Sequence, residues 1–435
     1  MPSHPGGGTR LDPWFGAYAA RTHGLRVSET RALFAVANRP EVVSLAGGMP
    51  FLDALPMDII AKVTSDLVAA EGTVALQYGN GQGHPRMREQ IAEVMAVESI
   101  AAHPDDVVVT TGSQQALDLV TRVFVDPDDV VLAEAPSYVG ALSVFKSYQA
   151  WVEHVPMDGD GLIPEALTEA IARLRAAGRR IKFLYTVPSF HNPAGVTQPL
   201  ERRAAILDIC QSNGILVVED NPYGMLAFDG TVTPAIRSMD GDGVIYLGSF
   251  SKTLAPGYRV GWAVAPHAVR EKLVLASEAS ILCPSQASQL SIAAYLEAED
   301  WLGQIGVYRL AYKERCDAML GALQEHMPEC SWTKPAGGFY TWVTVPEGIN
   351  TKAMLPRATT ALVAYVSGVA FYADGQGGRQ MRLSFCYPTP ERIREGVRRL
   401  AGVLAKEIEL IELFGPHGRE LSGEGDVQAP APDLA

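Results

Sequence analysis

A short segment, residues 248–262, carries the side chains with the clearest chemistry. It reads GSFSKTLAPGYRVGW and follows an apolar, β-branched run, so it begins where a predicted strand ends. The amine of Lys252 can form an imine with an aldehyde. The hydroxyls of Ser249 and Ser251 and the guanidinium of Arg259 can bind a phosphate. Since pyridoxal 5'-phosphate (PLP) carries both an aldehyde and a phosphate, we expect these four residues to anchor it.

A carboxylate follows the apolar run at residues 215–219. Asp220 could hold a proton on the ring nitrogen of PLP, which makes the ring an electron sink. The alternative is that Asp220 caps a helix at the surface, because buried aspartates need a partner. In two nearby motifs, Asn192 and Tyr223 could donate to the phenolate O3' of the cofactor. His191, next to Asn192, is expected to be a wall residue and not a base.

Two further strand ends offer cofactor contacts. Gly112 permits a tight turn, and Ser113 and Gln114 open a predicted helix whose N-terminus could hold a phosphate. The alternative is an ordinary turn capped by Ser113. Tyr138 follows the next strand and could stack on a flat heterocycle, or it could be a core tyrosine.

Read in order, these motifs resemble the fold-type-I PLP enzymes, specifically the class I/II aminotransferases, over residues 28–413. The resemblance implies that Lys252 forms the imine and then acts as general base between substrate Cα and cofactor C4'. It implies that Arg382, in a predicted strand, grips the substrate α-carboxylate, for which a planar guanidinium is suited. An exposed arginine on that strand is the alternative. It also implies that Tyr78 reaches the cofactor phosphate of a neighbouring subunit, and hence a homodimer with shared active sites.

Two N-terminal motifs bear on the substrate. Residues 43–50 resemble the loop that covers the substrate side chain in 2-aminoadipate/kynurenine-type aminotransferases, and Gly48 lies in it. Residues 28–33 resemble a helix start in which an arginine, here Arg31, pairs with a distal substrate carboxylate. An exposed helix arginine is an equal alternative. The expected donors are 2-aminoadipate, glutamate, aromatic or branched-chain amino acids, and the expected acceptor is 2-oxoglutarate.

Two other functions fit parts of the sequence. One is a PLP-dependent lyase of the same fold, because the sequence does not show which Cα bond is broken. The other is a non-catalytic PLP-sensing module like those joined to DNA-binding domains, although no basic or helical segment precedes residue 28.

The candidate site residues follow several different predicted strands. They can form one site only if the ends of those strands lie close together in a sheet. Continuous apolar runs alternate with helical segments, which predicts a mainly parallel sheet covered on both faces, with ligands at the carboxyl ends of its strands. The expected fold is α/β, a fold-type-I PLP-dependent transferase with a seven-stranded sheet and a smaller α+β domain. The predicted divisions are an N-terminal arm that joins the small domain and the active-site cover (1–57), a large PLP-binding domain (58–300), a small domain (301–414) and a disordered tail (415–435).

Composition narrows the range of partners. The chain has 435 residues, 47% of them apolar, and a net charge of -13, which argues against nucleic acid or an anionic membrane as partner. Its five cysteines lack a C-x-x-C pair and its histidines lack metal-ligand spacing, so we expect a reducing environment and no metal. No signal peptide or spanning segment is predicted, and the expected location is the cytoplasm.

Overall fold

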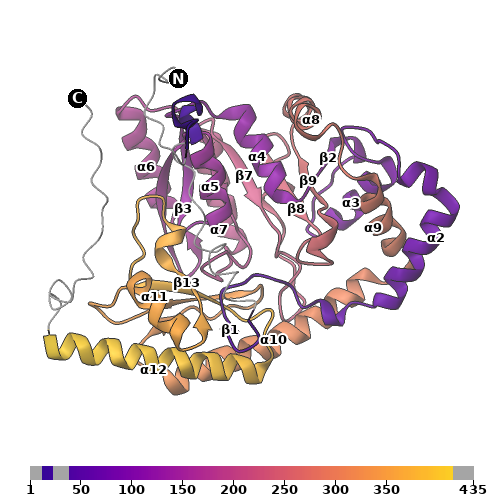
Figure 1. The fold of residues 1–435 in the computed structure, drawn as a ribbon. Coiled ribbons are helices and arrows are strands. Elements are labelled where there is room, and N and C mark those ends of the chain that lie inside the picture. Colours follow the sequence, from indigo (N-terminus) through magenta and orange to yellow (C-terminus); the bar gives the residue numbers. More distant parts are fainter. Residues whose placement is uncertain (1–11, 23–38, 415–435) are drawn as a thin grey trace, which may run out of the picture.

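The structure, a computed structural model, describes residues 12–22 and 39–414 (Figure 1). At its centre is an eight-stranded sheet of order β2-β9-β8-β7-β6-β3-β4-β5. The strands are β2 (Val107–Thr110), β3 (Val130–Ala135), β4 (Trp151–Asp158), β5 (Gly161–Leu162), β6 (Ile181–Thr186), β7 (Leu216–Asp220), β8 (Val244–Ser249) and β9 (Gly261–Val264). Within this order, each pair of neighbouring strands between β8 and β4 is parallel. The expected mainly parallel sheet is confirmed, but it has eight strands and not the expected seven, because β5 adds a short strand at its edge.

Three features of this sheet were not predicted. Strand β4 was missed because polar residues and a proline interrupt it and Trp151 at its start is exposed. Strand β5 adds a two-residue antiparallel edge to β4. Strand β9 runs antiparallel to both β2 and β8, because the chain returns from β8 without a crossover helix long enough to restore the parallel direction.

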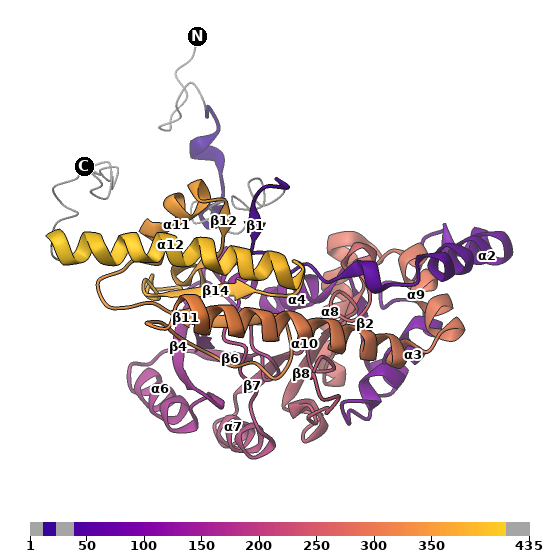
Figure 2. The same cartoon turned by 90° about the horizontal axis from the view of Figure 1, so that it is seen from below.

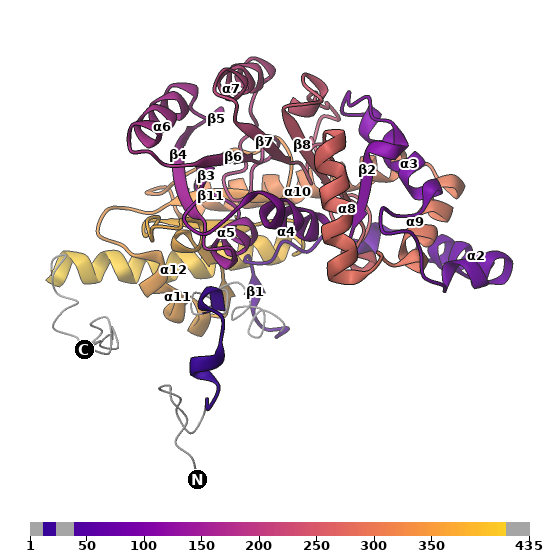
Figure 3. The ribbon, with the colours of Figure 1, turned by 90° about the horizontal axis from the view of Figure 1, so that it is seen from above.

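Helices cover both faces of the sheet, as Figure 3 shows. One layer contains α4 (Ser113–Phe124), α5 (Val139–Ser147) and α8 (His267–Ile281), and the other contains α6 (Pro164–Ala176) and α7 (Leu200–Ser212). Alternate residues of β3 serve the two layers: Val131 and Ala133 belong to one hydrophobic core, and Val130 and Leu132 to the other. This two-residue period is what a strand buried on both faces requires.

The second unit is built on an antiparallel sheet of order β10-β11-β14-β13. Its strands are β10 (Ser331–Trp332), β11 (Tyr340–Thr344), β13 (Val366–Ser367) and β14 (Gln380–Ser384), and its helices are α10 (Trp301–His326), α11 (Thr351–Thr360) and α12 (Pro390–Phe414). Helices α10 and α12 pack side by side (Figure 2). Strand β1 (Val43–Ser44) pairs with β12 (Val363–Ala364), so the chain touches this unit before it enters the large sheet.

Helices α2 (Met57–Ala75), α3 (Pro85–Ala96) and α9 (Gln286–Ala298) lie together at one end of the molecule (Figure 1). The predicted domain limits at residues 57, 300 and 414 remain predictions. Over residues 12–22 and 39–414, no helix is long and apolar enough to cross a membrane. The same residues contain no cluster of three or more His, Cys, Asp or Glu side chains that could hold a metal ion.

Candidate active site

The carboxyl ends of β6, β7 and β8 and the N-terminus of α4 open into one cavity. Eight of the predicted site residues line it, together with Val187 and Pro222: Ser113, Tyr138, Asn192, Asp220, Tyr223, Ser249, Ser251 and Lys252. They come from segments far apart in sequence. The sheet brings them together because parallel strands end at the same edge.

Lys252 follows the end of β8 and enters this cavity. Its Nζ donates to the backbone oxygen of Gly48 at 2.8 Å. Burial lowers the pKa of the Lys252 ammonium to about 8, and the nearby cations of Arg382 and Arg259 act in the same direction. A lysine with a lowered pKa is a better nucleophile and proton acceptor at neutral pH.

Asp220 is the last residue of β7 and is 5% exposed. Tyr185 donates to its Oδ2 at 2.8 Å, while its Oδ1 is buried without a hydrogen-bond partner in the described part of the chain. Burial raises the pKa of this carboxyl to about 6, and the bond from Tyr185 opposes that effect. A buried carboxylate oxygen without a donor is costly, so the site fits a ligand that brings an N–H group to it. The ring nitrogen of PLP is such a group.

Arg382 joins the second unit to this cavity. From β14, its Nη1 donates to Asn192 Oδ1 at 2.8 Å and its Nη2 to the backbone oxygen of Ala46 at 2.6 Å. The guanidinium lies 4.2 Å from the ring centre of Tyr340. Its Nε is buried and has no hydrogen-bond partner among residues 12–22 and 39–414. Because arginine only donates, Asn192 must present its oxygen to Arg382, and the N–H groups of its Nδ2 remain for other partners.

Hydroxyls and a guanidinium gather beside the start of α4. Ser249 Oγ donates to Ser251 Oγ at 2.8 Å, and Arg259 Nη2 donates to the backbone oxygen of Thr111 at 3.2 Å. Gly112 has φ of 81°, and a Cβ there would lie 2.6 Å from Arg259 Nη2. The first N–H groups of α4 lack intrahelical acceptors, as at every helix start. This arrangement suits a phosphate.

Gln114 holds Tyr138 in place. Tyr138 Oη donates to Gln114 Oε1 at 3.3 Å, and Gln114 Nε2 donates to the backbone oxygen of Gly140 at 3.1 Å. Burial raises the pKa of Tyr138 to about 12, so its hydroxyl stays protonated. Gln114, predicted to bind the cofactor itself, has its side chain engaged with the tyrosine.

Six predicted residues within the described part of the chain are not among those that line the cavity: Gly112, Gln114, Arg259 and Arg382, whose contacts are given above, and Tyr78 and Gly48. Tyr78 is 75% exposed. Gly48 reaches the site through its backbone, and a Cβ there would lie 2.0 Å from Tyr340 Oη. Arg31 lies outside the described residues.

Sequence reasoning missed several polar residues around the site. Tyr185 and Tyr340 lie inside strands, where aromatic residues are ordinary, and Tyr223 Oη donates to Tyr340 Oη at 3.4 Å. Beneath the Asn192 loop, His191 Nε2 lies 3.1 Å from Oε2 of the fully buried Glu134. Its Nδ1 accepts from the backbone N–H of residue 194 at 3.2 Å, which places the ring proton on Nε2. His191 is buried, and it is not among the residues that line the cavity.

The fold and this cavity define a PLP-dependent enzyme of fold type I. Comparison with known proteins gives the family: residues 40–400 match the model of "Aminotransferase class I and II". The chain therefore belongs to the class I and II aminotransferases, and it is a PLP-dependent transaminase.

Its relatives cover nearly its full length. Aromatic-amino-acid aminotransferase 1 of Thermococcus litoralis is 41% identical over 396 residues, covering 90% of this chain and 95% of the relative. The 2-aminoadipate transaminase of Thermus thermophilus is 37% identical, covering 92% and 99%. The crystal structure of Pyrococcus horikoshii kynurenine aminotransferase in complex with PMP superimposes with a TM-score of 0.87 at 38% identity, covering 92% of this chain and 100% of that one.

Proposed function

We propose that this enzyme moves the amino group of an L-amino acid to 2-oxoglutarate by a ping-pong mechanism, with aromatic amino acids and 2-aminoadipate as the preferred donors. The names of its relatives support this choice, since they include aromatic, 2-aminoadipate and kynurenine aminotransferases. Glutamate and branched-chain amino acids are further candidate donors.

The observation that carries the proposal is the state of Arg382. Its side chain is 3% exposed, yet its Nε has no hydrogen-bond partner in the described chain. A buried guanidinium with a free N–H beside an amine is a receptor for the α-carboxylate of an amino acid, because the paired N–H groups match two carboxylate oxygens.

When bound, PLP supplies an electron sink that makes the Cα–H of an attached amino acid acidic. In our proposal the neutral Nζ of Lys252 would accept that proton and carry it to C4' of the cofactor. Asp220 Oδ1 would hold the proton on the ring nitrogen, and Asn192 Nδ2 and Tyr223 Oη would donate to O3'. Arg382 orients the substrate so that its Cα–H faces Lys252.

A half-reaction experiment tests this. The purified PLP-loaded enzyme is mixed with single amino acids, and the loss of its lysine-bound cofactor absorbance is followed. Conversion by aromatic amino acids or 2-aminoadipate, reversed by 2-oxoglutarate, is the expected result.

Lys252→Ala should abolish turnover, and near-wild-type activity of that variant would refute the mechanism. Arg382→Lys keeps the charge but loses the planar fork, so it should raise KM far more than a surface Arg→Lys change. Release of pyruvate and ammonia without a 2-oxo acid would point to the lyase instead.

The distal carboxylate of 2-aminoadipate needs its own receptor, and we assign it to Arg31. Arg31→Ala should weaken turnover of 2-aminoadipate and glutamate while leaving phenylalanine unchanged. Equal loss for all three donors would remove Arg31 from substrate recognition.

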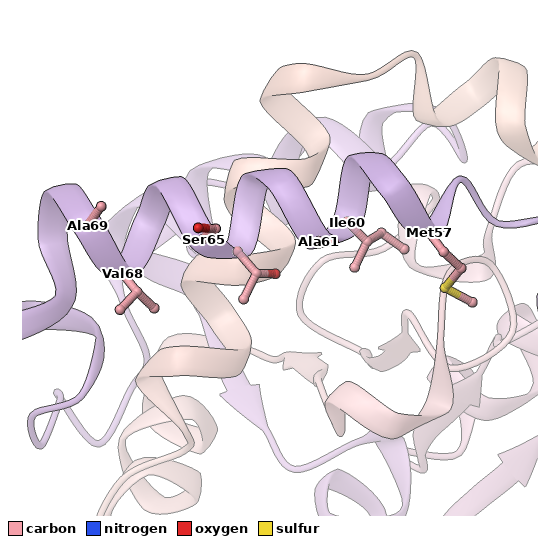
Figure 4. Close-up of a pocket in the computed structure, with 7 residues that line it drawn as sticks. Met57, Ile60, Ala61, Ser65, Val68 and Ala69 are labelled. Atoms are coloured by element: carbon pink, nitrogen blue, oxygen red, sulfur yellow. The ribbon is translucent and has the colours of Figure 1, made fainter.

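We also propose that two copies of the chain assemble through the outer face of α2. A pocket lies along this helix, lined by five apolar residues and two hydroxyl residues: Met57, Ile60, Ala61, Thr64, Ser65, Val68 and Ala69 (Figure 4). Val68 is 49% exposed, and Leu76 and Tyr78, just beyond the helix, are 72% and 75% exposed. Large apolar side chains exposed close together in the chain are typical of an interface. A second copy is the occupant we favour, because the family resemblance sends Tyr78 to the cofactor phosphate of a neighbouring subunit.

Complementation tests the shared site. Tyr78→Phe and Lys252→Ala subunits are each expected to be impaired, but a mixed dimer would contain one site with both native side chains. Recovered activity on mixing unfolded-and-refolded subunits supports the proposal. Additive activities of the two variants, or a monomer by light scattering, would refute it.

A further inference from the structure

Tyr185 has no assigned role in the reaction, yet it touches Asp220, the carboxylate proposed to hold the proton on the ring nitrogen of the cofactor. It lies on β6, next to β7, and is fully buried. Its Oη donates to Asp220 Oδ2 at 2.8 Å. Its ring packs edge-on against Phe145 of α5, with ring centres 5.5 Å apart and planes at 76°. The hydroxyl is therefore fixed from two sides, by the strand and by the helix.

The bond from Tyr185 divides the two oxygens of Asp220 between different partners. Oδ2 is taken by the tyrosine, and Oδ1 is left buried without a hydrogen-bond partner in the described residues. A carboxylate held by one oxygen cannot turn freely about its last bond. A hydrogen bond to a carboxylate also favours its charged form. Tyr185 therefore controls both the direction and the charge of Asp220.

We infer that Tyr185 is a positioning residue for PLP: it holds Asp220 ionised and aimed so that Oδ1 receives the N–H of the cofactor ring. This inference rests on the proposed function, in which Asp220 holds the proton on the ring nitrogen. Burial alone raises the pKa of Asp220, and the Tyr185 bond is what acts against it. A carboxyl that lost this bond would be neutral over a wider pH range and a weaker partner for a pyridinium.

The test measures binding of PLP to the full-length PLP-free protein. Dissociation constants are determined for the wild type, Tyr185→Phe, Asp220→Asn and the double variant. Tyr185→Phe keeps the ring that packs on Phe145 and removes one bond to a charged group, so we expect the dissociation constant to rise about tenfold or more. The double variant should bind PLP no more weakly than Asp220→Asn alone, because the tyrosine acts through the carboxylate.

A matched control is available in the second unit. Tyr365 is also fully buried, and its Oη donates to the backbone oxygen of Thr351 at 2.5 Å. Tyr365→Phe loses a buried tyrosine hydroxyl far from Asp220 and should leave PLP affinity unchanged. Unfolding temperatures of the PLP-free forms separate a loss of stability from a loss of binding.

The pH dependence of PLP affinity is a second measurement, and a purely structural role for Tyr185 would not change it. Loss of the Tyr185 bond raises the pKa of Asp220, so the affinity gap between wild type and Tyr185→Phe should be wider at pH 6 than at pH 8.5. A constant gap, unchanged affinity in Tyr185→Phe, or multiplied effects in the double variant would overturn the inference. If Asp220→Asn itself bound PLP as tightly as the wild type, the placement of Asp220 would be what failed.

Discussion

The ammonium group of Lys252 should lose its proton near pH 8 in the PLP-free enzyme, well below the 10.5 of a solvated lysine. Burial is the main cause, because a charged amine loses water without gaining a carboxylate, and the cations of Arg382 and Arg259 add to it. At pH 8 about half of the Lys252 amines would be neutral, against roughly one in 300 for an unperturbed lysine. Since only the neutral amine is nucleophilic, the protein gains reactive lysine at neutral pH.

Competitive labelling measures this value directly. The PLP-free enzyme is treated with trace acetic anhydride at a series of pH values, and acetylation of each lysine is followed by mass spectrometry. Lys62 serves as internal control, because it is exposed and its ion pair with Asp66 raises its pKa. Labelling of Lys252 should reach half its maximum near pH 8, while labelling of Lys62 continues to rise above pH 10. Parallel profiles for the two lysines would refute the reasoning.

Three other perturbations have definite expected results. Burial raises the pKa of Glu98 to about 7 from its ordinary value of 4.5, so the stability that protonated Glu98 contributes is present below pH 4.5 and is lost as the pH rises through 7. Glu98→Gln should therefore gain about 3 kcal/mol in free energy of unfolding relative to wild type between pH 4.5 and 8, measured by urea titration. Gly48→Ala should raise KM for amino donors about tenfold or more, because its Cβ would meet the Tyr340 hydroxyl, and Tyr340→Phe should restore part of the loss in steady-state kinetics. His191→Leu should destabilise the protein by about 1–3 kcal/mol because it removes the polar Nε2 that lies 3.1 Å from the buried Glu134 carboxylate, and His191→Gln should recover part of that in thermal unfolding.

Local sequence signals were sufficient to predict most of the helices and strands of the fold. The helical segments predicted between the apolar runs include α7 in the structure, and the longer helices α10 and α12 belong to the smaller unit. None of the three contains a proline after its first residue, so nothing of that kind in the local sequence interrupts the helix. Strand β4 was missed for the opposite reason. Its residues alternate irregularly between exposed and buried, and only pairing with β3 makes them a strand.

The site residues also divide into those that local motifs predict and those that depend on contacts distant in sequence. Lys252, Asp220 and Asn192 were predicted because each lies in a recognisable motif at or after the end of a strand. Tyr185 was not, since a tyrosine inside an apolar strand is ordinary, and its role depends on a residue 35 positions away. The contact between Tyr223 and Tyr340 spans 117 positions. Pairings at such distances are set by strand order and crossing helices, which one sequence does not report.

The hydrogen bonds of Arg382 bear on how a substrate would enter. Its Nη2 donates to the backbone oxygen of Ala46, and Lys252 Nζ donates to that of Gly48. The loop of residues 46–48 therefore accepts hydrogen bonds from both side chains. If Arg382 binds the α-carboxylate through Nε and Nη2, the carboxylate must take the place of the Ala46 oxygen. An ionised acceptor forms the stronger bond with a guanidinium than a neutral carbonyl does, so the exchange is favourable. Substrate binding would then release residues 46–48 from Arg382, and attachment of the cofactor to Lys252 would release them from the lysine. On this argument the loop is held in place most firmly when neither ligand is bound.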